Sequence, residues 1–282
     1  MNGRHAVADP MGNHRPGLLN VVASELLRLR RRGIALGWLG LTAALAVLIN
    51  VVMFQIVKNG NPPPLNGPGI NFPTAATLLS DNGIVAGLPA ASSMFGVVAL
   101  SFWALATSTD YSTGLIRILV SAQPRRWSLV IGKWIALAIA TALTTGVALV
   151  VSLMVAPIAA RAAGFAPTAW GTNLGPDLAS ATVNLFCALL VWGTIGLALA
   201  TLTRSSGIAI GVGIGYVLLL ETVIKAAVSS AGRWLPGTTI AALANGGTPD
   251  LAYERALALG LVYVVVALGA ALVVFTRRDV TD

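Results

Sequence analysis

The sequence predicts an all-α, polytopic integral membrane protein with six transmembrane helices, and composition is the first reason. The chain of 282 residues is 56% hydrophobic and 10% charged, whereas an ordinary soluble domain has about a quarter charged residues. Six apolar tracts approach the roughly 20 residues that a helix needs to cross a hydrocarbon core. Backbone groups in lipid must be hydrogen-bonded within the segment, and the tracts lack the alternation of a β-barrel, so helices are expected.

The expected spans lie at approximately 33–57, 84–108, 130–157, 179–203, 205–227 and 255–276. Five of the underlying tracts contain no charged residue. The tract 205–227 reaches full length only with Glu221 and Lys225 at its end. Because these two residues are four apart on a helix, we expect them to form an ion pair near the outer surface.

The N-terminal region is polar and divides into two parts. Residues 1–17 have no periodicity and predict a disordered cytoplasmic tail. Residues 18–32 place their leucines on one arc of a helix, which predicts an amphipathic interfacial helix. Arg28, Arg31 and Arg32 are then expected to meet lipid headgroups. A simple cytoplasmic anchor for the first span is the alternative. The six-span domain follows as residues 33–282.

The distribution of basic residues predicts the orientation. The N-terminal tail, the loops after the second and fourth expected spans and the C-terminus hold 13 of the 18 Lys and Arg residues. Acidic residues divide evenly, so the formal net charge of +8 belongs to one face. By the positive-inside rule both termini are cytoplasmic, and the protein is expected in the inner (cytoplasmic) membrane. The high isoelectric point therefore reflects topology, and no nucleic-acid partner is expected.

Glycines recur every four residues in the tract 205–227, at Gly207, Gly211 and Gly215. Such a surface lets two helix backbones approach closely, so we expect helix packing there. The pattern leaves open whether the neighbour belongs to the same subunit or to a second one.

The loop 109–123 is the most informative polar segment. Its apolar residues Tyr111, Leu115 and Ile118 fall on one helical face and Arg117 turns away from it, which predicts a short surface helix suited to a protein groove. The alternative is that the charges of this loop only enforce topology.

Four features in and after this loop are similar to those of the permease subunits of ABC-2 type transporters. They are the acidic residue, the Gly-x-x-Arg, the Pro-x-Arg and the Gly-Lys formed by Asp110, Gly114–Arg117, Pro124–Arg126 and Gly132–Lys133. The resemblance implies a coupling helix that docks in a cytoplasmic ATPase. The implied ATPase-coupling residues are Asp110, Tyr111, Gly114, Leu115, Arg117 and Ile118. It also implies a second permease chain, with a homodimer favoured.

The sequence predicts no enzyme activity for the chain itself. It has no Gly-x-x-x-x-Gly-Lys-Ser/Thr phosphate loop, so ATP and magnesium are expected only in a partner ATPase. Zinc-protease and serine-hydrolase motifs are missing, and neither a cofactor nor a metal site is expected. We therefore expect the permease subunit of an ATP-driven exporter. A non-transporting membrane scaffold or assembly protein and a secondary transporter remain alternatives, and the sequence does not identify a cargo.

Overall fold

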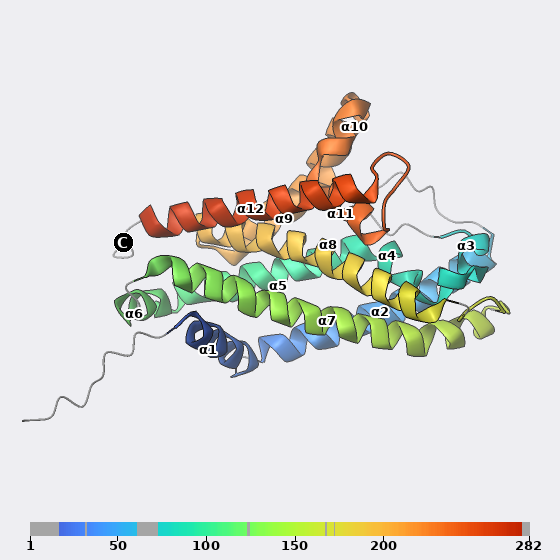
Figure 1. Ribbon diagram of the computed structural model, residues 1–282, viewed down its shortest axis with the longest axis horizontal. Coiled ribbons are helices and arrows are strands. Elements are labelled where there is room, and N and C mark those ends of the chain that lie inside the picture. The colour runs from blue at the N-terminus through green and yellow to red at the C-terminus, as the bar shows by residue number, and fades with distance from the viewer. Residues whose placement is uncertain are drawn as a thin grey trace, which may run out of the picture.

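The computed structural model describes residues 17–31, 33–60, 73–122, 125–166, 168–171 and 173–277 (Figure 1). Every regular element in these ranges is a helix, and no strand occurs among them. The all-α prediction is confirmed. Apart from Gly17, the tail predicted for residues 1–17 lies outside the described residues.

Five long helices form an elongated bundle (Figure 1), and each is long and apolar enough to cross a membrane. They are α2 (Ile34–Lys58), α5 (Ser92–Ser112), α7 (Arg126–Ala162), α8 (Leu174–Thr203) and α12 (Tyr253–Arg277). The chain is thus a helical membrane protein. Helix α7 exceeds its predicted bounds and continues through Pro157. In the most apolar stretch of α8, 67% of the residues are buried, against 11% in α12, so α8 is central and α12 peripheral.

The contact between α5 and α8 is built from large side chains set against glycines. Trp192 on α8 lies directly on Gly96 of α5, and Trp103 on α5 lies on Gly193 of α8. Both indoles are almost fully buried. Such small-residue positions let neighbouring helices pack tightly in lipid, where no hydrophobic effect drives them together.

Polar side chains connect the spans within the bundle. Hydrogen bonds join α7 to α5, α8 and α2, at 2.9–3.1 Å, through Trp103 Nε1–Thr141 Oγ1, Trp134 Nε1–Thr194 Oγ1 and Asn50 Nδ2–Ser152 Oγ. A buried donor without a partner costs free energy, so these bonds fix the register of the helices as well as stabilising them.

The second span begins later than predicted. Short helices α3 (Ala75–Leu79), η1 (Asp81–Val85) and α4 (Gly87–Ala90) precede α5, so the start predicted at residue 84 is wrong. Gly83 and Gly87 let this segment pack closely, because a Cβ at Gly83 would strike the Leu78 carbonyl and one at Gly87 would lie 2.9 Å from Asn50 Oδ1. The segment before α5 therefore packs tightly against its neighbours, and it consists of short helices instead of one continuous helix.

The tract 205–227 is helical but falls into three pieces, α9 (Ser206–Gly215), the π-helix η2 (Tyr216–Leu220) and α10 (Glu221–Ala227). Figure 1 shows α10 pointing away from the bundle. None of the three is long enough to count among the five spanning helices. The sixth span expected at 205–227 stays a prediction.

The glycine stripe of α9 does not pack inside the chain. A Cβ at Gly207, Gly211 or Gly215 would meet no described atom within 4 Å. The opposite face of α9 makes the contact instead, with Ala209 fully buried and Gly213 against Leu100. The sequence left open whether this stripe packs on a helix of the same subunit or of a second one. Within the described residues, no helix of the same subunit packs on it.

Two further helices, η3 (Ser229–Trp234) and α11 (Pro236–Ala244), lead back to α12. Glu221 is 2% exposed, and its Oε1 accepts a hydrogen bond of 2.6 Å from the backbone N–H of Gly237 in the first turn of α11. Carboxylates are stabilised at helix N-termini. The expected pair with Lys225 is present at 3.8 Å, but the contact with α11 explains why this acid interrupts an apolar tract.

Candidate functional site: the charge cluster beside helix α6

Helix α1 (Leu18–Arg31) lies against the beginning of α7, at the same end of the bundle as α6 (Leu115–Ala122) and the C-terminal end of α12 (Figure 1). Val21, Val22 and Leu29 are buried by this packing. A Cβ at Gly132 would lie 2.5 Å from Val21 Cγ1, so only glycine allows the approach. The amphipathic helix predicted at residues 18–32 is confirmed as a helix, and part of its apolar face contacts protein.

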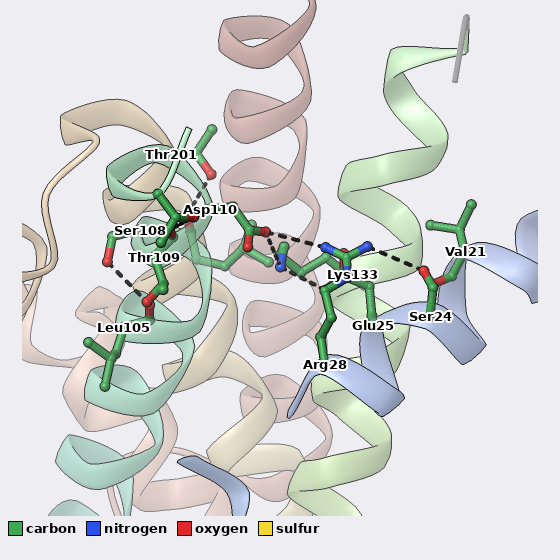
Figure 2. Close-up of polar contacts among 12 residues, drawn as sticks. Val21, Ser24, Glu25, Arg28, Leu105, Ser108, Thr109, Asp110, Lys133 and Thr201 are labelled. Atoms are coloured by element: carbon green, nitrogen blue, oxygen red, sulfur yellow. Dashed lines mark hydrogen bonds and ion pairs between the residues drawn. The ribbon is translucent and has the colours of Figure 1, made fainter. Parts of the chain in front are cut away.

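Four charged side chains meet between α1, α5 and α7 (Figure 2). Lys133 Nζ lies 2.8 Å from Glu25 Oε2 and 2.7 Å from Asp110 Oδ2. Arg28 Nη1 lies 3.0 Å from Glu25 Oε1 and 3.9 Å from Asp110 Oδ2. We call these residues the charge cluster. Its two carboxylates and two cations cancel in formal charge.

Burial makes the charge cluster important for the fold. Glu25 is 3% exposed and Asp110 1% exposed. An ionised carboxylate withdrawn from water is costly unless it is paired and hydrogen-bonded, and in such surroundings charges interact more strongly than at a surface. The charge cluster therefore joins α1 to α5 and α7, and its members depend on one another.

A small cavity of about 20 Å³ adjoins the charge cluster and is lined in part by Thr107, Asp110, Lys133 and Thr201. The Thr107 hydroxyl is buried without a hydrogen-bond partner among the described residues. A cavity of this size has room for about one water molecule. The Asp110 carboxylate and the Thr107 hydroxyl border it, while most of its lining is apolar.

Helix α6 follows α5 after a tight turn. Gly114 has φ +68°, a left-handed conformation that glycine adopts without strain and that commonly ends a helix. The predicted short helix is confirmed. It is attached to the bundle through Ile116, which is buried, and through the partly buried Leu119 and Val120.

The predicted docking face divides in two. Ile118 is 65% exposed and Arg117 is exposed, so both point away from the bundle. Leu115 and Tyr111 are half-buried, and Tyr111 packs against the core with the Arg204 guanidinium 6.0 Å from its ring centre. A partner could therefore reach Arg117 and Ile118 fully and the other two only at their edges.

Two predicted site residues have other roles in the structure. Asp110 belongs to the last turns of α5 and its carboxylate is buried in the charge cluster, so it is not presented to a partner. Arg28 points into the same cluster instead of toward lipid headgroups. The Arg31 side chain and Arg32 lie outside what the structure describes.

Glu25 and Lys133 were not predicted as site residues. A usable signal existed, because Glu25 is the only acid in an arginine-rich helix and Lys133 stands at the edge of an apolar span. Within the described ranges no group of three His, Cys, Asp or Glu side chains is placed to hold a metal ion.

Five apolar helices with α5 and α8 at their centre, and a buried charge cluster at one end, define a polytopic helical membrane protein. Comparison with family models gives a match over residues 41–281, and the chain belongs to that family, which is described as a protein of unknown function (DUF2705). No curated protein matches the chain significantly.

Proposed function

We propose that the chain is the membrane-spanning permease subunit of an ATP-driven exporter, forming the translocation path as a dimer and coupled to a separate ATP-binding subunit through α6. The observation that supports this best is the construction of α6. Its outer face presents Arg117 and Ile118 to solvent while its inner face is attached to the bundle through Ile116. An exposed apolar residue beside a cation is suited to a groove on a protein partner.

The connections of α6 provide a path for mechanical coupling. The turn at Thr113–Gly114 joins it directly to α5, and α5 packs along α8 at the centre of the bundle. The charge cluster joins the end of α5 to α1 and α7. A displacement of α6 by the partner would therefore move α5 and α1 together. ATP and magnesium act in the partner.

The coupling role is tested by reversing the charge of the outer face and by making it polar. We expect Arg117→Glu and Ile118→Asp each to lower copurifying Mg-ATPase activity at least tenfold, because truncating a central interface residue costs about 2 kcal/mol or more. The level of the chain in the membrane should stay unchanged, since both side chains are exposed. The readout is ATPase activity of the tagged chain purified in mild detergent.

Arg255→Glu is the matched control, because it makes the same charge change on an exposed residue at the opposite end of the bundle. If both α6 variants retain the activity of this control, α6 is only a connection between spans. Wild-type chain that copurifies with no ATPase would instead support a scaffold or a secondary transporter.

We further propose six crossings with both termini cytoplasmic in the inner membrane. Residues 206–227 are helical throughout and are about as numerous as a crossing requires, although α10 turns away from the bundle (Figure 1). The basic residues near α1, α6 and the end of α12 support this orientation through the positive-inside rule.

Cysteine labelling tests the orientation. In a Cys187→Ser background, we expect Asn59→Cys to react with an impermeant maleimide in intact cells and Ser121→Cys to react only after lysis, because the two exposed positions lie at opposite ends of the bundle. The reverse pattern would place α6 outside the cell and remove the basis for coupling.

The dimer is supported by the uncovered face of α9 and η2. Gly207, Gly211 and Gly215 face open space, and a hollow of about 430 Å³ beside them is lined by residues that include Leu219 and Val223. Small residues next to apolar side chains are typical of helix interfaces in membranes. A second copy of the chain would bury this face by two-fold symmetry.

A further inference from the structure

A polar pocket of about 360 Å³ lies at the end of the bundle opposite α6. It is enclosed by α3, η1 and α4, by the first turns of α8 and by the end of α11. Its polar lining consists of Thr77, Asn82, Asp177, Ser180, Asn184 and Asn245. The remaining lining includes Val85, Ala86 and Pro89, which give the pocket an apolar side.

Asp177 supplies a negative charge that no cation in the described part of the chain neutralises. Within the described ranges no Lys or Arg nitrogen forms an ion pair with its carboxylate. The Asn82 amide nitrogen lies 2.7 Å from both carboxylate oxygens once the amide is oriented by its hydrogen bonds. A neutral amide positions the carboxylate and leaves its charge available to a ligand.

Two other amides are each fixed by one hydrogen bond, and within the described residues the second group of each has no partner. Asn184 Oδ1 accepts a hydrogen bond of 2.6 Å from the Tyr253 hydroxyl, which leaves its NH₂ as a donor. Asn245 Nδ2 donates to the Ala241 carbonyl at 2.7 Å, which leaves its Oδ1 as an acceptor. The pocket therefore offers a carboxylate, a donor and an acceptor in positions set by the fold.

The position of the pocket relative to the membrane allows such a polar lining. Helix α8 has 30 residues and, at about 1.5 Å per residue, is roughly 45 Å long, whereas the hydrocarbon core is about 30 Å thick. Asp177 lies in the first turn of α8. Its carboxylate is then at the headgroup or aqueous level, where a water-soluble ligand can reach it.

We propose that this pocket binds a small polar solute that carries both a protonated amine and hydroxyl groups, the chemistry of an amino sugar. The Asp177 carboxylate pairs with the ammonium group, and the amides of Asn184 and Asn245 bind hydroxyls. The volume is in the range of small-molecule sites and fits a single sugar ring. Binding here does not depend on ATPase coupling.

Calorimetry on the purified full chain in nanodiscs tests the proposal with three probes. Glucosamine has the amine and the hydroxyls, glucose has only the hydroxyls, and choline has a cation with a single hydroxyl. We expect glucosamine to bind at least tenfold more tightly than either of the other two. Asp177→Asn should reduce glucosamine affinity to that of glucose and leave glucose unchanged. Asn245→Ala should weaken both sugars.

Asp250→Asn is the control, because it removes an exposed acid outside the pocket lining and should leave all three affinities unchanged. Thermal melting of each variant separates loss of binding from loss of folding, and Asn245→Ala leaves the Asp177–Asn82 contact intact. The proposal is overturned if wild-type chain does not bind glucosamine, if Asp177→Asn binds it as tightly as wild type, or if choline binds equally well.

Discussion

Lys133→Met is expected to destabilise the chain by about 3–5 kcal/mol, the usual cost of removing one partner from a buried ion pair. Lys133 Nζ contacts both Glu25 and Asp110, and its side chain is 12% exposed. Without it, two buried carboxylates would share the single cation of Arg28, which lies 3.0 Å from Glu25 but 3.9 Å from Asp110. The measurement is the free energy of unfolding in detergent, together with the amount of chain in the membrane.

A double variant distinguishes loss of charge balance from loss of packing. Lys133→Met with Asp110→Asn restores equal numbers of acids and cations, so it should be less destabilised than the sum of the two single variants. Lys225→Met is the control, because Lys225 is 44% exposed and its contact with Glu221 is 3.8 Å. Equal effects at Lys133 and Lys225 would show that the charge cluster does not hold α1 in place.

The helices could be predicted from the sequence because a long apolar tract is stable in lipid only as a helix, so hydropathy alone locates it. Long apolar tracts became α2, α7, α8 and α12 within a few residues of the predicted bounds. Where local packing interrupts the helix, the same signal fails. The tract 84–108 is continuously free of charge, yet η1 and α4 precede α5, which begins only at Ser92, and Gly83 and Gly87 pack closely against other parts of the chain.

The site could be predicted only in outline. Charges near span ends identify a side of the membrane, but they do not reveal whether a side chain faces water or another helix. Asp110 and Gly132–Lys133 were recognised as parts of a pattern around α6, whereas Asp110 pairs with Lys133 itself, and Gly132 and Lys133 contact α1, about a hundred residues away in the sequence. Pairing at that separation depends on tertiary structure.

Glycine spacing was a weaker guide than glycine surroundings. The regular repeat on α9 faces open space, while the glycines that pack against protein, Gly96, Gly193 and Gly196, follow no repeat across the two helices that carry them. Gly96 and Gly193 each face a tryptophan of the partner helix and Gly196 faces the backbone of Leu100, and these matches appear only once α5 and α8 are side by side.

Gly196→Ala is expected to destabilise the chain by about 1–3 kcal/mol, the range for overpacking a core. A Cβ at Gly196 would lie 2.5 Å from the backbone carbonyl oxygen of Leu100, and this backbone atom cannot rotate away as a side chain could. Helices α5 and α8 would have to separate at the centre of the bundle. The readout is again the free energy of unfolding in detergent, with membrane level as a second measurement.

Gly211→Ala is the matched control, and it should raise the free energy of unfolding where Gly196→Ala lowers it. Nothing described lies within 4 Å of a Cβ at Gly211, so the variant gains helix propensity, up to about 1 kcal/mol, without a clash. Gly211→Leu should likewise keep the folded chain but reduce crosslinking between two copies, because it would block the proposed dimer face. If Gly196→Ala proves as stable as Gly211→Ala, then α5 and α8 are not in close backbone contact at Gly196, and a rigid connection from α6 through α5 to α8 loses its physical basis.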